Sequence, residues 1–189
     1  MAIKSDGWII DACETKQLIT PYVTTQVSDK DGVKLISYGV SSYGYDIRVG
    51  NEFTKLKQYE SATLDPKKSE HSWEHYTTDM PTVVNPGSFI LARSVETFKI
   101  PRNILAICLG KSTYARCGVI VNVTPLEPEW EGVLTIEISN TSPVPVFIYP
   151  NEGIAQLLFL ESDEVCTTSY SDKKGKYQSQ TGVTIAKLK

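Results

Sequence analysis

Residues 133–139 read VLTIEIS, a run in which apolar and polar side chains alternate. Successive side chains of a β-strand point to opposite faces, so the run predicts a strand with one apolar and one polar face. The two faces are Leu134, Ile136 and Ile138 against Thr135, Glu137 and Ser139. An ionised glutamate is costly to bury in such a strand. Glu137 therefore either faces solvent on an exposed sheet or lines a pocket as a general acid or base.

Short segments rich in Val, Ile, Thr and Tyr recur on both sides of this run, separated by Gly, Pro, Asn and Asp. This spacing predicts a mainly β fold, a sandwich or a barrel. The segments are YDIRV (45–49), SFILARSV (88–95), ILAICL (104–109), GVIVNV (118–123), VPVFIY (144–149) and IAQLLFL (154–160). The N-terminal stretch 6–19 instead predicts a short helix, with Ser5 as its N-cap.

The 189 residues, 41% of them hydrophobic and 22% charged, suit one domain spanning 1–189. No apolar run reaches the roughly 18 residues of a membrane span, and the N-terminus carries no export signal. The four cysteines are scattered, which favours a reducing, cytoplasmic compartment.

Zinc chemistry has few possible ligands in this chain: His71, His75, Cys13, Cys108, Cys117 and Cys166. The cysteines form no C-x-x-C pair. His71 and His75 have the i, i+4 spacing that suits a metal on a helix, but not the H-E-x-x-H pattern. They lie in the polar, proline-broken stretch 57–80, which reads as a long excursion from the core. A loop pair without a metal role is favoured, and a zinc enzyme is disfavoured.

Charge is unevenly distributed. Residues 172–189 hold five basic residues against one acid, whereas the rest of the chain holds 14 basic and 21 acidic residues. A basic tail suits nucleic acid, a membrane surface, a compact anion such as a nucleotide, or solubility alone. The chain lacks a basic stripe with interleaved aromatic residues, so we expect neither a nucleic-acid nor a membrane partner.

Three further stretches carry groups suited to an anion or a cation. Residues 110–116, GKSTYAR, combine a glycine, hydroxyls and two cations that could hold phosphates, although the spacing is not a Walker loop and a capped turn is the alternative. Residues 125–132 bring Glu127, Glu129 and Glu131 together, either as ligands of a hard cation or as an acidic surface turn. Residues 173–184, KKGKYQSQTGVT, are either a flap over a polyanion or a frayed tail.

Taken together, these motifs resemble one family. The stretch from Gly110 to Phe159 closely resembles the core of the dCTP deaminases, non-zinc enzymes related in fold to trimeric dUTPases. SYGYDIRV upstream and GKYQSQTGVT downstream are similar to the same family. The resemblance implies a distorted, dUTPase-like β-barrel with few helices, assembled as a homotrimer with active sites shared between neighbours. It also implies that residues 170–189 close over the nucleotide.

The resemblance assigns roles by position. Glu137 matches the catalytic acid/base, and Ser112 and Arg116 match further catalytic positions. Asp46 is similar to an aspartate of the first dUTPase motif. The nucleotide-binding positions implied are Lys111, Ser112, Thr113, Tyr114, Ala115, Arg116, Thr135, Ile136, Glu137, Gln156, Tyr170, Lys176 and Gln180.

The reaction implied is hydrolytic deamination of dCTP to dUTP and ammonia, which supplies a precursor of dUMP and dTMP. Mg²⁺ would accompany the triphosphate without a protein ligand, and no zinc would take part. Three alternatives share the fold: a bifunctional deaminase that also forms dUMP, a plain dUTPase, and a nucleotide-binding regulator without catalysis.

Overall fold

The computed structural model describes residues 2–57, 63–67 and 73–187. Thirteen strands and two helices make up this part of the chain, which confirms the mainly β prediction. The helices are α1 (Asp6–Lys16) and α2 (Ser112–Ala115). The strands are β1 (Ala2–Ile3), β2 (Ile19–Thr20), β3 (Val27–Lys30), β4 (Val33–Ser41), β5 (Gly44–Leu56), β6 (Trp73–Thr77), β7 (Thr82–Val84), β8 (Phe89–Lys99), β9 (Ile104–Gly110), β10 (Val119–Asn122), β11 (Glu131–Asn140), β12 (Val146–Ile148) and β13 (Gly153–Glu161).

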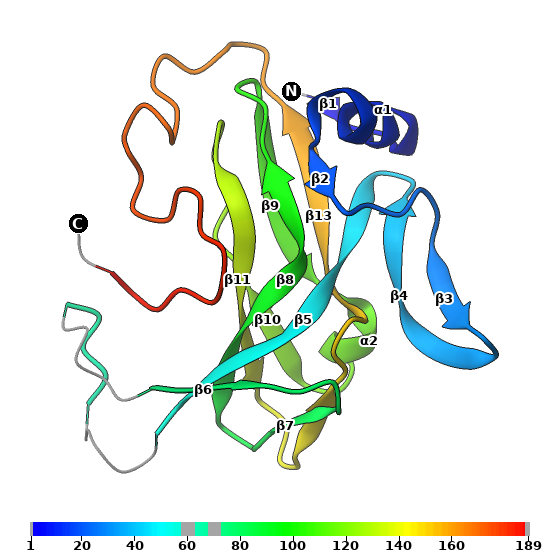
Figure 1. Ribbon diagram of the computed structural model, residues 1–189, viewed down its shortest axis with the longest axis vertical. Helices are drawn as coiled ribbons and strands as arrows, with labels where there is room; N and C mark the ends of the chain where they lie inside the picture. Colours follow the sequence, from blue (N-terminus) through cyan, green and yellow to red (C-terminus); the bar gives the residue numbers. More distant parts are fainter. Residues whose placement is uncertain (1, 58–62, 68–72, 188–189) are drawn as a thin grey trace.

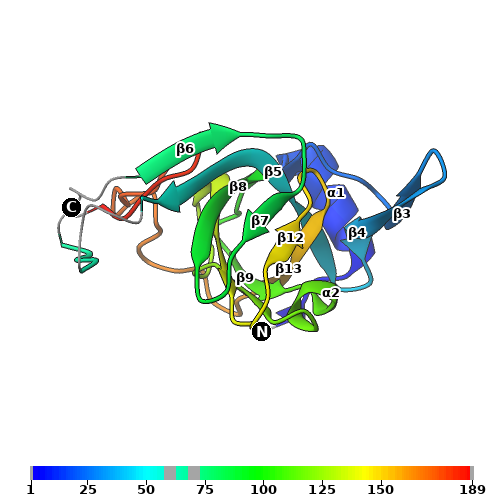
Figure 2. The same ribbon diagram turned by 90° about the horizontal axis from the view of Figure 1, so that it is seen from below.

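Eleven of these strands form one strongly curled sheet (Figures 1 and 2). Its main path runs β1-β13-β5-β8-β11-β10, and β9 also pairs with β13. A second, two-stranded sheet joins β12 to β7. The curled sheet encloses a core that includes Tyr45, Phe53, Phe98 and Phe159, each at most 1% exposed. β8 and β11 lie side by side in this sheet and carry the residues on which the site depends.

Each of the seven segments predicted as strands overlaps an observed strand. The N-terminal helix is also present, as α1, and Ser5 occupies its N-cap position, but the helix ends at Lys16. The prediction is therefore wrong for 17–19, where Gln17 has a φ of 57° and Ile19 belongs to β2. The Ser5 hydroxyl makes no capping bond. The carboxylate of Asp6 accepts the N–H of Gly7 instead, at 2.7 Å.

The sequence reading missed six strands: β1, β2, β3, β4, β6 and β7. β3 and β4 form a projecting hairpin around Asp31 and Gly32, which both have positive φ, as an Asp-Gly turn favours. β6 pairs with β5 within the stretch expected to leave the core, so the prediction of a continuous excursion over 57–80 is wrong for 73–77. Residues 58–62 and 68–72 lie outside the described part of the chain.

Candidate active site

Glu137 lies on β11, directly opposite Leu91 of β8 and Asn122 of β10. The predicted alternation is confirmed: Ile136 and Ile138 are fully buried on the core side, and Glu137 points to the other face. Glu137 is therefore not a solvent-facing residue on a sheet edge. Because a strand runs along each side of it, its backbone position is fixed.

A register shift interrupts the pairing of β11 with β8 between Val133 and Thr135, just before Glu137. The buried Ser94 stabilises this bulge, since its hydroxyl accepts the N–H of Leu134 at 2.9 Å and donates to the carbonyl of Glu96 at 2.6 Å. Bulges change the direction of neighbouring side chains and are common beside active sites. Here Leu134, Thr135 and Glu137 all line one cavity.

This cavity has a volume of about 410 Å³, and its walls are mainly apolar and aromatic. Five parts of the chain supply it: residues 64–66, Trp73 of β6, strands β8 and β11, residues 123–130 after β10, and the C-terminal segment. Its lining comprises Leu64, Asp65, Pro66, Trp73, Phe89, Leu91, Val123, Thr124, Pro125, Leu126, Glu127, Trp130, Leu134, Thr135, Glu137, Tyr170, Tyr177, Gln180, Thr184, Ile185 and Ala186. A small number of polar groups in an apolar pocket is typical of a small-molecule site.

The Glu137 carboxylate carries the unusual electrostatics of the cavity. Its Oε2 atom is buried and has no hydrogen-bond partner among the described residues. Burial raises the pKa of Glu137 to about 7. The hydrogen bond from its own backbone N–H lowers this pKa, but by less than burial raises it. Burial, followed by repulsion from Glu137, also raises the pKa of the Cys108 thiol to about 12, so Cys108 stays protonated. Glu137 is thus poised between its two protonation states near neutral pH.

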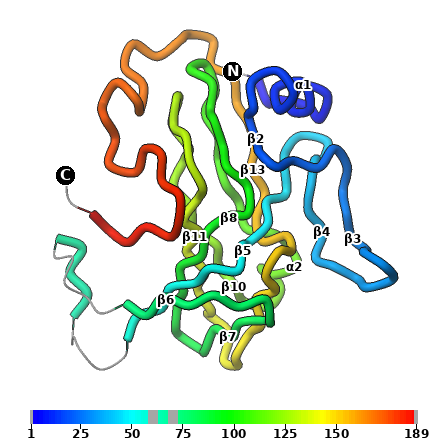
Figure 3. Tube along the Cα trace, viewed as in Figure 1, coloured from blue at the N-terminus to red at the C-terminus, as the bar shows by residue number. Residues whose placement is uncertain are grey.

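The C-terminal segment, residues 162–187, runs back across the molecule to the free edge of β11 (Figure 3). Gln180 forms a parallel bridge with Gly132: its carbonyl accepts the N–H of Val133 at 3.0 Å, and its side chain donates to the Val133 carbonyl at 2.6 Å. Further on, the N–H of Thr184 bonds to the Thr135 hydroxyl at 3.0 Å. The segment is therefore packed on the sheet as one wall of the cavity, and it is not a frayed tail.

Residues 111–116 lie elsewhere, around α2 at the end of β9 (Figure 1). In the described part of the chain, none of them lines the Glu137 cavity. Lys111 is largely buried and pairs with Asp46, with 2.5 Å between Nζ and Oδ2. Tyr114 is buried, and its hydroxyl accepts the N–H of Tyr149. Ser112, Thr113, Ala115 and Arg116 are exposed.

Gln156 belongs with this second group of residues. It lies on β13, opposite Asp46 of β5 and Leu109 of β9, and its amide donates to the Ser41 hydroxyl at 2.9 Å. Asp46, Lys111 and Gln156 thus form one polar cluster that is separate from the cavity. The thirteen positions implied by the resemblance therefore fall into two groups within one chain.

The group around the cavity includes Thr135, Glu137, Tyr170 and Gln180. Ile136 is not part of the lining, because its side chain is in the core. Lys176 is exposed and outside the lining; its ammonium donates to the Lys187 carbonyl at 2.6 Å and lies over the Tyr177 ring.

The candidate metal ligands are engaged in other contacts. Glu127 pairs with Lys173 and Glu129 with Arg102, each at 2.7 Å, which supports the acidic turn over a cation site. His75 lies on β6 with its Nδ1 atom 2.7 Å from the Thr54 hydroxyl, and His71 falls outside the described residues. Within the described ranges there is no group of three or more His, Cys, Asp or Glu that could hold a metal ion, and no helix that could cross a membrane.

Sequence reasoning missed several wall residues, among them Trp130, Tyr177, Thr184 and Ile185. The aromatic residues gave no signal of their own, since buried aromatic side chains are common in any core. In the sequence, residues 182–184 (GVT) are typical only of part of a flap. The bond from the Thr184 N–H to the Thr135 hydroxyl depends on a tertiary pairing.

The chain was compared with known proteins. A family model described as dCTP deaminase-like matches residues 3–162. The chain is 59% identical over 189 residues to the dCTP deaminase of Acinetobacter baumannii strain AYE, covering 99% of this chain and all of that protein. It is 58% identical over 188 residues to the dCTP deaminase of Acidithiobacillus ferrooxidans strain ATCC 53993, again covering 99% and 100%.

One solved structure gives a further comparison. The 2'-deoxycytidine 5'-triphosphate deaminase of Agrobacterium tumefaciens matches with a TM-score of 0.63 at 17% identity, over 85% of this chain and 48% of that chain. This match supports the fold, and the sequence matches above define the family. The chain belongs to the dCTP deaminase-like family.

Proposed function

We propose that this protein is a hydrolase that converts dCTP and water to dUTP and ammonia, with Glu137 as the general acid/base. The observation that carries this proposal is a half-buried carboxylate whose buried Oε2 atom has no hydrogen-bond partner among the described residues, and which lines a cavity with mainly apolar walls. A pKa of about 7 lets one group accept and return a proton near neutral pH. The dCTP deaminases that match over the full chain support the same assignment.

The proton transfers balance on one residue. Ionised Glu137 takes a proton from water as the water oxygen bonds to C4 of cytosine, and it delivers that proton to N3. It then takes the proton of the new hydroxyl and gives it to the amine, so that the C4–N bond breaks and ammonia leaves. Acid/base catalysis by one group contributes about 10²–10⁴-fold, and the rest must come from orientation and electrostatic stabilisation.

The free edge of β11 suits recognition of a base. β10 ends at Asn122 opposite Glu137, and the C-terminal segment pairs with the backbone of β11 from Glu131 to Val133. In the described structure the Thr135 backbone lies between these two partners and is bonded to neither, whereas the N–H of Leu134 is bonded to the Ser94 hydroxyl of β8. This supports the proposal that the backbone of Thr135 and Ile136 reads the edge of the base while Tyr170 and Gln180 enclose the nucleotide.

We further propose that the phosphates bind to residues 111–116 of a second copy, within a homotrimer. The Glu137 cavity offers no lysine or arginine in its lining among the described residues, yet a triphosphate needs cations. The exposed Arg116 and the hydroxyls of Ser112 and Thr113 provide such groups, but in this chain they lie around α2 and outside the lining of the Glu137 cavity. A rotationally symmetric assembly brings unlike surfaces of neighbouring subunits together. Gln156 and Lys111 would then contribute from the same neighbour.

Magnesium fits this arrangement as a partner of the phosphates. Lys111 is already paired with Asp46, so much of the triphosphate charge would lack a protein cation. Mg²⁺ bound to the phosphate oxygens would supply that charge compensation. The described residues hold no carboxylate cage for it, and Glu137 performs the proton chemistry. The four free thiols support a cytoplasmic location, and we propose neither a nucleic-acid nor a membrane partner.

The test is a product assay. The protein is incubated with Mg²⁺ and either dCTP or dUTP, and ammonia and pyrophosphate are measured separately. Ammonia from dCTP with dUTP as the only nucleotide product is the expected result. Pyrophosphate together with dUMP would indicate the bifunctional alternative, pyrophosphate from dUTP alone a plain dUTPase, and binding without product a regulator.

A further inference from the structure

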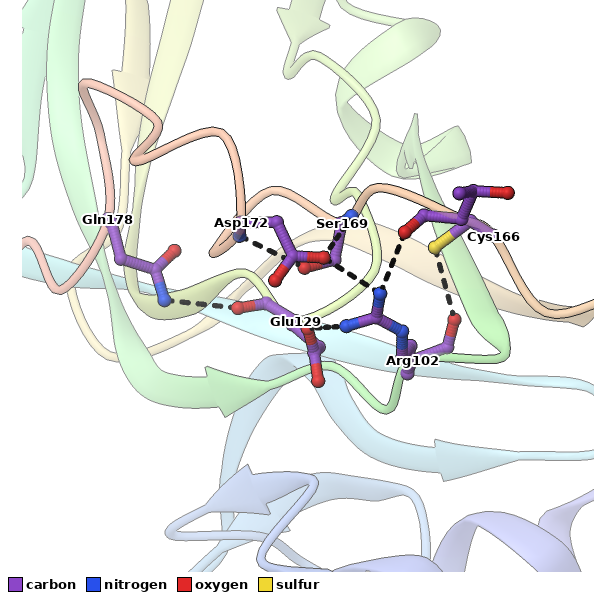
Figure 4. A network of polar contacts seen from close by, with 7 residues as sticks. Arg102, Glu129, Cys166, Ser169, Asp172 and Gln178 are labelled. Atoms are coloured by element: carbon purple, nitrogen blue, oxygen red, sulfur yellow. Dashed lines mark hydrogen bonds and ion pairs between the residues drawn. The ribbon is translucent and has the colours of Figure 1, made fainter.

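We propose that Arg102 is a positioning residue for the proposed deamination, which it serves by holding two aromatic walls of the cavity, Trp130 and Tyr170, from behind. Arg102 follows β8 in the turn that leads to β9, and in the described structure it is not part of the cavity lining. Its guanidinium instead joins the turn at Glu129 to the C-terminal segment at Thr167 and Asp172 (Figure 4). The inference rests on the proposed function only for its kinetic consequence.

The guanidinium makes three contacts with different segments. Nη1 donates to the Glu129 carboxylate at 2.7 Å, and Nη2 donates to the Asp172 carboxylate at 2.7 Å and to the Thr167 carbonyl at 3.1 Å. The Arg102 carbonyl also accepts the Cys166 thiol at 3.7 Å. A planar fork with several donors reaches two carboxylates at once, which a lysine ammonium on a flexible stem does less well.

The contact with Glu129 fixes the first wall. Glu129 has a φ of 62°, so the chain turns sharply immediately before Trp130. The turn is bonded to Ile100 beside Arg102, since Glu129 donates its N–H to the Ile100 carbonyl and Trp130 accepts the N–H of Ile100, both at 3.0 Å. The indole of Trp130 then donates to the Tyr177 carbonyl at 3.0 Å. Releasing Glu129 would loosen the indole and the tail segment bonded to it.

The contact with Asp172 fixes the second wall. The Asp172 carboxylate also accepts the N–H of the buried Ser169, and the Ser169 hydroxyl accepts the N–H of Asp172. This closed turn contains Tyr170, whose own N–H donates to the Pro128 carbonyl at 2.9 Å. The N–H of Ser169 and then the Arg102 guanidinium lower the pKa of Asp172, so the carboxylate stays ionised at neutral pH.

Both partners of Arg102 lie outside the curled sheet core. Glu129 is in a turn and Asp172 is in the C-terminal segment, and neither packs among the buried residues of the sheet. Loss of the fork should therefore leave the sheet folded while the C-terminal segment opens. The walls would close on a nucleotide less often, and binding would weaken more than the chemical step, because Glu137 stays fixed between β8 and β10.

The experiment compares Arg102→Gln and Arg102→Lys with Lys34→Gln, which changes an exposed pair on the β3–β4 hairpin. We expect Arg102→Gln to raise KM for dCTP about tenfold with kcat changed less than about threefold. Arg102→Lys should fall between this variant and wild type, and Lys34→Gln should match wild type. Unchanged KM, or equal losses in kcat at unchanged KM, would overturn the proposal.

A second measurement does not depend on the reaction. Limited trypsin digestion of the nucleotide-free protein should cut faster after Lys173, Lys174 or Lys176 in Arg102→Gln than in wild type, at the same midpoint of thermal unfolding of the core. Asp172→Asn should increase cleavage similarly, and the double variant should be no worse than either alone. Tail cleavage at the wild-type rate in both single variants would overturn the proposal. If wild type releases no ammonia from dCTP, only the proposed function fails, because the digestion still tests whether Arg102 holds the C-terminal segment in place.

Discussion

Two carboxylates in this molecule, those of Asp46 and Glu137, differ in whether a cation lies beside them. Asp46 on β5 is 5% exposed and bonds to the Lys111 ammonium, so its charge is compensated where it is buried. Glu137 on β11 is half-buried, its buried Oε2 atom has no partner among the described residues, and burial raises its pKa to about 7. A paired buried carboxylate keeps its charge and its place, whereas an unpaired one becomes able to exchange protons. The difference separates a structural ion pair from a candidate catalytic group.

The largest expected effect comes from removing the unpaired carboxylate. Glu137→Gln keeps the size of the side chain, so we expect ammonia release from dCTP to fall by about 10²–10⁴-fold while dCTP still binds. Steady-state rates and equilibrium binding measure the two properties separately. Glu74→Gln on β6, where the carboxylate is exposed and pairs with Lys55, is the control. Near-normal turnover in Glu137→Gln would contradict the assigned role.

A smaller loss is expected at the other part of the molecule. Arg116→Ala should lower deamination about 10²-fold, because a phosphate or transition-state contact is lost. If sites are shared between neighbours, mixing inactive Glu137→Gln with Arg116→Ala under conditions of subunit exchange restores activity. Random assembly makes about one site in four intact. No recovery in verified mixed assemblies would place both residues in a site within one chain.

The pH dependence of deamination should follow the protonation state of Glu137. Glu137 must be ionised to take a proton from water, and its raised pKa keeps it largely protonated below pH 7. We therefore expect kcat/KM to fall about tenfold per pH unit below pH 7 and to level off above it. Binding of dCTP to Glu137→Gln over the same range corrects for titration of the phosphates. An apparent pKa near 4.5 would mean that Glu137 is as well solvated as an ordinary glutamate.

The smallest expected effect concerns the C-terminal segment, which forms one wall of the cavity. A Cβ on Gly175 would lie 2.1 Å from the Tyr170 ring, so Gly175→Ala must displace a cavity wall. We expect KM to rise several-fold and the apparent pKa of the rate profile to move down toward that of a solvated carboxylate. Gly7→Ala, where a Cβ on α1 meets no atom within 4 Å, serves as the control. A Gly175→Ala profile identical to wild type would show that Tyr170 does not exclude water from Glu137.

Much of the sheet and the key residue could be predicted from local pattern. The alternation over 133–139 placed Glu137 on the face opposite Ile136 and Ile138, and the structure confirms it. The β3–β4 hairpin was missed because β3 is polar and largely exposed, although Asp31-Gly32 was a usable turn signal. β6 was missed because its residues are polar and gain their pairing from β5.

The candidate site was predictable only in part. Family resemblance grouped thirteen positions, but it gave no distances, and the structure separates Lys111 and Gln156 from Glu137 within one chain. It also places Lys176 against the Lys187 carbonyl, outside the cavity lining. The Arg102 contacts were invisible to sequence reading, because they join positions up to 70 residues apart.

The sequence by itself determined seven of the thirteen described strands, the face on which Glu137 lies and the family, because side-chain periodicity and ordered motifs are properties of neighbouring residues. Tertiary structure decided whether that glutamate is charged or neutral at neutral pH. Burial depends on Trp130, Tyr170 and other walls brought from distant segments, and ion pairing depends on which cation lies within reach. Lys111 reaches Asp46, and in the described structure no lysine or arginine lines the cavity of Glu137. Solvation and charge pairing are set by distance in space, which residue order alone does not define.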